Sequence, residues 1–329
     1  MENRKIAIVG CGIIGNVHAQ VLSEQGYEIA ALCDVDEVAL TKTKEKFAPN
    51  ALAYTNYAKM IDEVSPYAVH ICTPHHLHAE ATIYALNRNI HVLCEKPLAI
   101  TRESLAAVLE AEKNSKANLG VCQQNRYNDV NVAVKELLTK NPAVYGHGTV
   151  TWNRGAWYYA QAAWRGKRAT EGGGVIINQA LHTFDLMQWM VGFPEELVGR
   201  ADNFTLQDVI EVEDTVSCVC FTGENRFTFF ATNAAKSDLP VEMNFKLKDG
   251  SLLTVFPERA YLNGEQITSA EMVKVYGKGC YGTGHTRLIR HFYECAEQGK
   301  PFPINGQEGA KVVRMILATY ESNGRKVKV

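Results

Sequence analysis

Three glycines near the N-terminus are spaced as a phosphate-binding turn requires. Gly10, Gly12 and Gly15 form a G-x-G-x-x-G pattern directly after a short apolar run at residues 6–9. The first glycine permits a tight turn, the second lets backbone approach a pyrophosphate, and the third lets the next helix pack closely on the strand. The first N–H groups of that helix would point at the phosphate oxygens. We therefore predict a dinucleotide site over residues 10–15.

One carboxylate bears on which dinucleotide binds. Asp34 follows the next apolar run, residues 29–33, near the expected offset of roughly 20 residues from the glycine pattern. A carboxylate there accepts hydrogen bonds from ribose hydroxyls and repels a 2′-phosphate. Val35, Asp36 and Glu37 follow it, so no Arg or Lys is close by in sequence. We predict NAD in preference to NADP. The alternative is a glycine-rich turn in another doubly wound domain, which the strand–turn–helix context disfavours.

A lysine is the second candidate for chemistry. Glu95 and Lys96 follow the apolar run at residues 91–94, and ligands of open α/β sheets bind at the carboxyl ends of the strands. A lysine ammonium can hydrogen-bond a substrate hydroxyl, and its pKa falls readily on burial. Taken alone, the same residues are equally explained as solvated charges at the end of a strand.

A polar stripe in an apolar segment is the third candidate. Residues 172–174 are glycines, and at helical spacing Asn178, His182 and Asp185 share one face of the segment 175–191. A helix that is apolar almost all round is buried, and its polar groups need partners that a ligand cleft supplies. A neutral imidazole is a credible base for a hydroxyl proton when hydride leaves the same carbon. A satisfied structural histidine is the alternative.

The first third of the chain alternates between short apolar runs and amphipathic stretches. The runs lie at residues 6–9, 29–33, 68–71, 91–94 and 119–122, and the helical patterns lie at about 13–25, 37–47, 56–64, 77–88 and 101–114. This alternation predicts βαβ units, and so an α/β fold with a Rossmann-type, doubly wound parallel sheet.

The pattern changes after Cys122. One more helix is predicted at about 128–140, and strands of period 2 follow at 148–152, 215–221, 227–231, 241–247 and 251–255. Period-2 alternation indicates a mostly antiparallel sheet with two different faces. We predict a NAD-binding domain over residues 1–122 and an α+β domain for substrate binding and oligomerisation over residues 123–329.

Composition excludes several classes of function. The 329 residues exceed the roughly 250–300 that one core usually fills, which favours two domains. A net charge of −2 without a basic block gives no footprint for nucleic acid or an anionic membrane. No long apolar run marks a secretory signal or a membrane span. The nine cysteines contain no C-x-x-C pair and are expected to be buried free thiols, which predicts a cytoplasmic protein.

Taken together, the glycine pattern, Glu95-Lys96-Pro97 and the Gly-Gly-Gly…His-x-x-Asp segment resemble the Gfo/Idh/MocA family of oxidoreductases, named for glucose–fructose oxidoreductase and inositol dehydrogenase. Thr73-Pro74-x-x-x-His78 and Asn125-Arg126-Tyr127 extend this resemblance over essentially the whole chain. It implies hydride transfer between a pyranose or cyclitol carbon and the nicotinamide. It also implies a second domain with an open-faced sheet, and a homodimer or homotetramer built on that sheet.

The resemblance assigns residues to roles. Lys96 corresponds to the catalytic lysine of the family and His182 to its catalytic histidine. Inositol dehydrogenase-like members carry an aspartate four residues before that histidine, where this chain has Asn178. Asparagine cannot take up a proton, but it can orient a hydroxyl. The form Asn-Gln-Ala-x-His looks more like the UDP-sugar and glycoside 3-dehydrogenases, which favours C3 of a pyranose as the reacting carbon.

The expected site follows from these assignments. The catalytic residues are Lys96, His182 and Asn178. The cofactor-binding residues are Gly10, Gly12, Ile13, Ile14, Gly15, Asp34, Thr73, Pro74, His78, Glu95 and Lys96. The residues expected to bind a carbohydrate or polyol substrate are Arg126, Trp164, Arg165, Asn178 and His182. No metal is expected, because the histidines at 75, 76 and 78 lack a suitably spaced carboxylate.

Two other classes of function fit the same fold. One is an NAD-binding sensor or regulator, which would need neither Lys96 nor His182. The other is a glycoside lyase or hydrolase that recycles a tightly held NAD, and it would need a further acid or base that the sequence does not reveal. The residues retained favour a dehydrogenase acting on a CH–OH group.

Overall fold

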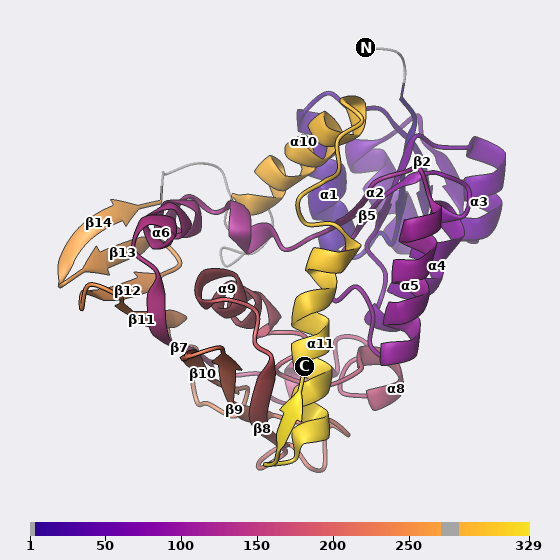
Figure 1. Cartoon of the computed structure of the whole chain (residues 1–329). Coiled ribbons are helices and arrows are strands. Elements are labelled where there is room, and N and C mark those ends of the chain that lie inside the picture. The colour runs from indigo at the N-terminus through magenta and orange to yellow at the C-terminus, as the bar shows by residue number, and fades with distance from the viewer. Residues whose placement is uncertain (1–3, 271–282) are drawn as a thin grey trace. The chain divides into compact units, whose positions relative to one another are not determined.

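The computed structural model describes residues 4–270 and 283–329, and Figure 1 labels most of its helices and many of its strands. The described residues divide into two compact units, one made of residues 4–124 and 283–310, the other of residues 125–270 and 311–329. We expected a single division after residue 122, with everything beyond it in the second domain. Residues 283–310 differ, because helix α10 (Gly284–Glu297) is amphipathic and packs its buried side chains in the first unit. Its Tyr293 ring lies 4.5 Å from that of Tyr27.

The first unit contains a six-stranded parallel sheet in the order β3-β2-β1-β4-β5-β6. Its strands are β1 (Ile6–Val9), β2 (Ile29–Cys33), β3 (Leu52–Tyr54), β4 (Ala68–Ile71), β5 (His91–Cys94) and β6 (Leu119–Val121). The helices are α1 (Ile13–Glu24), α2 (Glu37–Phe47), α3 (Tyr57–Val64), η1 (His75–Leu77), α4 (His78–Leu86), α5 (Arg102–Asn114) and α10. Every residue of β1 and β4 is buried, as expected for strands covered on both faces. The predicted Rossmann sheet is confirmed.

The second unit is built on a nine-stranded sheet in the order β14-β13-β12-β11-β7-β10-β9-β8-β15. Its strands are β7 (Ala143–Thr151), β8 (Glu196–Asp202), β9 (Thr215–Thr222), β10 (Asn225–Thr232), β11 (Glu242–Leu247), β12 (Leu252–Phe256), β13 (Arg259–Leu262), β14 (Glu265–Ser269) and β15 (Lys326–Lys328). β7 and β10 pair in parallel, and the other neighbours pair antiparallel. The predicted mostly antiparallel sheet is confirmed.

Several helices belong wholly or partly to the second unit. They are η2 (Gln124–Tyr127), α6 (Asp129–Lys140), α7 (Ala156–Tyr159), α8 (Arg168–Glu171), α9 (Leu181–Val191) and α11 (Gly306–Ser322), whose first residues belong to the first unit. In Figure 1, α9 lies against β7 and β10. Phe184 of α9 stacks on Phe229 of β10, with ring centroids 4.8 Å apart. Tyr145 and Phe230, from neighbouring strands, are 40% and 37% exposed, so the sheet presents aromatic side chains to solvent.

Two expectations from composition can be compared with the described residues. No helix in residues 4–270 and 283–329 combines the length and apolar character needed to cross a membrane. The eight cysteines in these ranges are all buried free thiols, as expected. Cys280 lies outside the described residues.

Candidate functional site

The glycine turn after β1 is shaped by two packing demands and one open position. Gly10 has φ +98°, and a Cβ there would overlap the carbonyl oxygen of Cys72. A Cβ on Gly15 would overlap the carbonyl oxygen of Gly10. A Cβ on Gly12, however, would meet no described atom within 4 Å. Packing therefore requires the first and third glycines, whereas the second leaves backbone exposed at the start of α1, where a pyrophosphate would fit.

Asp34 is held firmly beside this turn. One carboxylate oxygen accepts the N–H of Cys11 at 2.6 Å, and the other accepts the N–H of Asp36 at 2.8 Å. The side chain is half-buried, at the end of β2. Ile13 lies at the start of α1 and is 56% exposed, whereas Ile14 is half-buried. Gly12, Ile13 and Asp34 thus offer the open backbone, apolar surface and fixed carboxylate that suit NAD.

His78 connects the loops that follow β4 and β5. Its side chain is buried, with Nδ1 2.7 Å from the carbonyl oxygen of Pro97 and Nε2 2.8 Å from that of Thr73. Burial lowers the pKa of His78. We predicted that His78 contacts the cofactor; the contacts described for its ring nitrogens are with these loops. Thr73 and Pro74 are half-buried and lie on the first loop.

Glu95 directly follows β5 and is a buried carboxylate with two imidazole neighbours. Its Oε1 lies 3.1 Å from Nε2 of His18 and 3.5 Å from Nε2 of His285. Burial by itself would raise the pKa of Glu95, but the two histidines hold that pKa well below its ordinary range. Oε2 accepts the backbone N–H of Lys96 at 3.2 Å. Glu95 therefore anchors the backbone that carries the half-buried Lys96 side chain.

A buried hydrogen-bond chain supports Glu95 from behind. Nδ1 of His18 lies 2.8 Å from Nδ1 of His70, whose Nε2 lies 2.8 Å from the Tyr293 hydroxyl. Burial holds the pKa of His70 well below its ordinary value. Neutral imidazoles satisfy every contact if the Tyr293 hydroxyl donates to His70, His70 donates to His18, and His18 donates to Glu95. Every N–H and O–H group of these three side chains then donates one hydrogen bond. The carboxylate of Glu95, at the end of this hydrogen-bond chain, carries the negative charge.

The histidine contacts bear on the question of a metal. Among the described residues, His18, Glu95 and His285 bring their donor atoms within 4.8 Å of one another. The 3.1 Å contact between His18 and Glu95 is itself a charge-assisted hydrogen bond, so we assign this pair to hydrogen bonding. Sequence reasoning missed them. His18 lies three residues after Gly15 on the buried face of α1, a polar residue in an apolar position, and that signal was available.

In the second unit, Glu171 is a buried carboxylate beside Asn178. Its Oε1 accepts a hydrogen bond from Nδ2 of Asn178 at 2.5 Å, and its Oε2 accepts the N–H of Gly166 at 2.5 Å. Glu171 is fully buried. Burial raises its pKa to about 7, although both hydrogen bonds oppose that rise. Sequence reasoning missed Glu171 too, although a charge directly before three glycines in an apolar region is a visible signal.

Asn178 does not lie on the helix that carries His182. The expected helix over 175–191 begins only at Leu181, and residues 175–180 form turns closed by bonds from Asn178 to Gly174 and from Ala180 to Val175. Helical spacing therefore does not relate Asn178 to His182. Both side chains are half-buried, with His182 in the first turn of α9.

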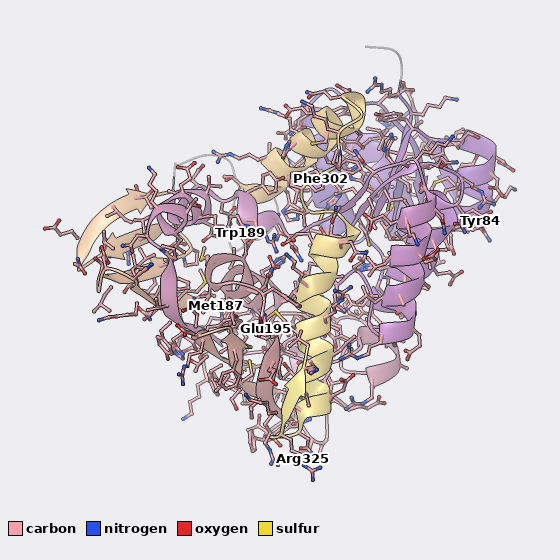
Figure 2. All side chains as sticks on the ribbon, viewed as in Figure 1. Tyr84, Met187, Trp189, Glu195, Phe302 and Arg325 are labelled. Atoms are coloured by element: carbon pink, nitrogen blue, oxygen red, sulfur yellow. The ribbon has the colours of Figure 1, made fainter. Side chains whose placement is uncertain are left out.

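Arg126 and Asp185 form a buried, bidentate ion pair. Nε and Nη2 of Arg126 each lie 2.7 Å from a carboxylate oxygen of Asp185, and the side chains are 5% and 1% exposed. The guanidinium also lies 5.4 Å from the centroid of the Trp189 ring, which Figure 2 labels on α9. We predicted a substrate contact for Arg126; the pair described here fixes α9, and thereby His182.

Trp164 and Arg165 lie in the loop before α8. The Arg165 guanidinium stacks 4.2 Å above the Tyr158 ring and lies 5.6 Å from the Trp164 ring. Trp164 and Arg165 are half-buried, so part of each remains available to a ligand. The Tyr158 hydroxyl accepts a hydrogen bond from Gln179 at 3.0 Å. This aromatic and basic surface suits a sugar ring or an anionic sugar.

The glycines before Asn178 are explained by packing within the second unit. A Cβ on Gly173 would overlap the Tyr320 hydroxyl, and one on Gly174 would overlap the carbonyl oxygen of Glu213. The Glu213 carboxylate accepts the N–H groups of Gly174 and Ile176, and the hydroxyl of Tyr320 at 3.0 Å. The backbone at Gly173 therefore packs against the Tyr320 side chain, which fixes the segment leading to Asn178.

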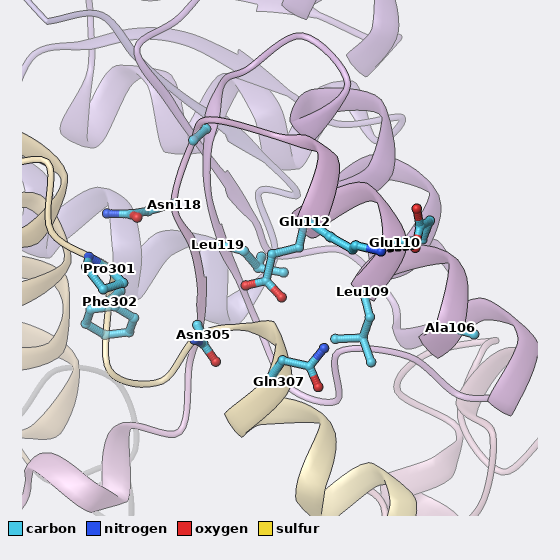
Figure 3. Close-up of a pocket in the computed structure, with 12 residues that line it drawn as sticks. Ala106, Leu109, Glu110, Glu112, Asn118, Leu119, Pro301, Phe302, Asn305 and Gln307 are labelled. Atoms are coloured by element: carbon cyan, nitrogen blue, oxygen red, sulfur yellow. Dashed lines mark ion pairs between the residues drawn. The ribbon is translucent and has the colours of Figure 1, made fainter.

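A hollow elsewhere in the first unit contains none of the predicted site residues. It has a volume of about 600 Å³ and lies between α5 and residues 301–307, as Figure 3 shows. Leu109 and Glu112 of α5 face Phe302 and Gln307 across it. Oε1 of Glu112 accepts the N–H of Gly306 at 2.8 Å, which fastens the two walls together.

Curated relatives support the predicted family. The inositol 2-dehydrogenase of Salmonella typhimurium strain LT2 is 30% identical over 190 residues, which are 57% of this chain and 54% of that protein. The chain thus spans about half the length of this relative. The D-glucoside 3-dehydrogenase of Escherichia coli K12 is 25% identical, over 97% of this chain and 95% of that protein.

Solved structures share the fold. The WlbA dehydrogenase from Bordetella pertussis, in complex with NADH and UDP-GlcNAcA, matches 100% of this chain and 99% of its own with a TM-score of 0.85 and 23% identity. Residues 4–123 match the family model described as "Oxidoreductase family, NAD-binding Rossmann fold", and residues 143–253 match the "GFO/IDH/MocA C-terminal domain". Since these two models together span more than half of the chain, the chain belongs to the Gfo/Idh/MocA family of oxidoreductases.

Proposed function

We propose that this protein is a dehydrogenase that transfers a hydride between a secondary alcohol carbon of a carbohydrate or cyclitol and the nicotinamide of NAD. The open backbone at Gly12 carries the proposal, because packing explains Gly10 and Gly15 but leaves Gly12 to a ligand. The carboxylate of Asp34, pinned by two backbone N–H groups, favours NAD over NADP. The first unit would bind the cofactor, and the second would bind the substrate.

The chain's own residues would bind and orient the substrate and would move its hydroxyl proton. When bound, the nicotinamide supplies the acceptor or donor of hydride. His182 takes the hydroxyl proton of the substrate, Lys96 hydrogen-bonds or polarises the same oxygen, and Asn178 orients a hydroxyl. Ketone reduction uses the same groups in reverse. Trp164 and Arg165 offer a stacking and basic surface to the sugar.

We further propose C3 of a pyranose, in a sugar, glycoside or nucleotide sugar, as the reacting carbon. The Asn-Gln-Ala-x-His segment that ends at His182 supports this choice. So does the resemblance to a D-glucoside 3-dehydrogenase along almost the whole chain.

We also propose that the protein is a cytoplasmic homodimer or homotetramer assembled through the open sheet face. Tyr145 and Phe230 on that face support an interface, since aromatic side chains are enriched in interfaces. The buried free thiols support a reducing compartment. Light scattering tests the assembly: a monomer at every concentration would contradict it.

The decisive experiment measures NADH formation by absorbance with excess NAD and a panel of glycosides, monosaccharides, uronic acids, UDP-sugars and inositols. Lys96→Met and His182→Ala are expected to lower kcat at least about 100-fold, because each removes a proton-transfer group. Both variants should still bind NADH as tightly as the unaltered protein, which a fluorescence titration measures. Near-unaltered turnover in both would remove these residues from the mechanism.

A further inference from the structure

The amide of Asn178 has a defined orientation set by Glu171. An amide has a donor end and an acceptor end, and a carboxylate can only accept. Nδ2 of Asn178 faces Oε1 of Glu171 at 2.5 Å, so the carbonyl oxygen of Asn178 is turned away from Glu171. The same Nδ2 lies 3.4 Å from the Tyr158 hydroxyl. These contacts describe Glu171 in its ionised form.

Protonation of Glu171 would reverse this preference. A protonated carboxyl carries an O–H donor, and its best partner is the oxygen of the Asn178 amide. The amide would then turn its NH2 group to the other side. An outward oxygen accepts a hydrogen bond from an alcohol, whereas an outward NH2 donates one to a ketone. The ionisation of one buried group would thus select between the two ends of the proposed reaction.

Several charged and titratable groups surround Glu171, and burial also raises the pKa of its neighbour Glu213. Arg165 lowers the pKa of Glu171, and Glu213 raises it. Tyr158, Tyr159 and Tyr320 also feel its charge, and burial raises the pKa of each of these phenols, so they stay neutral near pH 7. The hydrogen bonds described for the Glu213 carboxylate go to Gly174, Ile176 and Tyr320.

We infer that Glu171 is a positioning residue that, through Asn178, sets the preference of the site for alcohol or ketone. Ionised Glu171 holds the Asn178 oxygen toward the hydroxyl of the substrate, and protonated Glu171 presents the NH2 group to a carbonyl. The inference rests on the proposed function for the placement of Asn178 at the substrate. The orientation itself rests on the contact between Glu171 and Asn178 alone.

The kinetic test uses the best alcohol and its ketone product between pH 6 and 8. The KM for the alcohol is expected to fall as pH rises through about 7, and the KM for the ketone to rise. Glu171→Gln, whose amide can donate to the Asn178 oxygen, should abolish both dependences and raise the KM for the alcohol about tenfold. The double variant Glu171→Gln with Asn178→Asp should restore the KM for the alcohol, because a carboxylate accepts on both sides. A KM for the alcohol that ignores pH, or that Glu171→Gln leaves unchanged, overturns the inference.

A second measurement needs no turnover. Carboxyl carbons labelled with ¹³C report the ionisation of Glu171 by NMR, assigned with Glu171→Gln. Asn178→Ala removes a donor to the ionised form, so the pKa of Glu171 should rise by about 1. An unchanged pKa overturns the inference. A normal titration in a protein that forms no NADH from any substrate contradicts the proposed function and leaves the contact between Glu171 and Asn178 standing.

Discussion

Two buried glutamates, one in each unit, have pKa values that are shifted in opposite directions. Glu95 is 5% exposed and Glu171 is fully buried, so both carboxylates lose most of their hydration. The pKa of Glu95 nevertheless lies well below its ordinary range, whereas that of Glu171 is raised to about 7. Burial alone therefore does not decide the charge of a buried carboxyl. The groups that contact the carboxyl also determine its charge.

The groups that contact the two carboxyls differ. Glu95 lies 3.1 Å from Nε2 of His18 and 3.5 Å from Nε2 of His285, and these two contacts lower its pKa. Glu171 accepts hydrogen bonds from the amide of Asn178 and the N–H of Gly166, and these lower its pKa less than burial raises it. The first unit thus holds an ionised carboxylate that fixes the backbone of Lys96, and the second unit holds a carboxyl whose ionisation changes near pH 7.

The largest effect is expected from Glu95→Gln. Removing the charge breaks a buried, hydrogen-bonded pair, so the free energy of unfolding at pH 7 should fall by about 3–5 kcal/mol. Urea unfolding measures this loss. Glu110→Gln on the exposed face of α5 is the matched control and should change the value by less than about 0.5 kcal/mol. Equal free energies of unfolding for the two variants would contradict a stabilising role for the Glu95 carboxylate.

The loss of stability caused by Glu95→Gln should become smaller as the pH falls. Because the folded pKa of Glu95 lies below its ordinary value of 4.5, its stabilisation is present above that value and disappears as pH falls toward the folded pKa. The gap between Glu95→Gln and the unaltered protein should therefore narrow below pH 4.5. A gap that widens in acid would show that the carboxylate is not held in its ionised form.

Glu171→Gln should act in the opposite direction. Its folded pKa of about 7 exceeds the ordinary 4.5, so the stability that this carboxyl contributes is complete below pH 4.5 and is lost as pH rises through 7. A neutral glutamine avoids that loss. We expect the variant to be more stable than the unaltered protein by up to about 3 kcal/mol at pH 8. At pH 5 the two proteins should nearly agree. Urea unfolding at both values that showed a destabilised variant at pH 8 would contradict the raised pKa.

Asp34 extends the comparison to a carboxylate that is only half-buried. Its oxygens are held by the N–H groups of Cys11 and Asp36, and its proposed role is to repel a 2′-phosphate. NAD should bind at least tenfold more tightly than NADP, a difference of roughly 1.4 kcal/mol. Asp34→Asn keeps the shape and removes the charge, so it should narrow that ratio. Fluorescence titrations with both dinucleotides measure it, and equal curves for the unaltered protein would refute the preference.

Much of the fold could be predicted because its signals are local. The apolar runs at residues 6–9, 29–33 and 91–94 coincide with β1, β2 and β5, since fully buried strands read as short apolar runs. β3 was missed because Leu52 and Ala53 are exposed and form no such run. The parallel pairing of β7 with β10 could not be read at all, because strand direction depends on connections rather than on alternation.

The site residues also divide into those with a local signal in the sequence and those without one. The turn over residues 10–15 could be predicted, since its strand, glycines and helix are contiguous. The meeting of His18, Glu95 and His285 could not, because no periodicity relates residues so far apart in the chain. Arg126 is instructive: an arginine beside a predicted cleft suggests a ligand, yet the structure shows its guanidinium bound to Asp185.

Each unit is built from segments that lie far apart in the sequence, so the order of synthesis limits when each unit can fold. The buried chain behind Lys96 includes Tyr293, and the packing that holds the glycine segment before Asn178 includes Tyr320. A nascent chain that has reached residue 270 has neither tyrosine. Glu95 then lacks His285, and Glu213 lacks a hydroxyl donor. Domains usually fold one after another as they leave the ribosome. Here the first unit cannot complete its interior until residues 283–310 have been made, and the second cannot until Tyr320 has been made, so we expect both to mature late in translation.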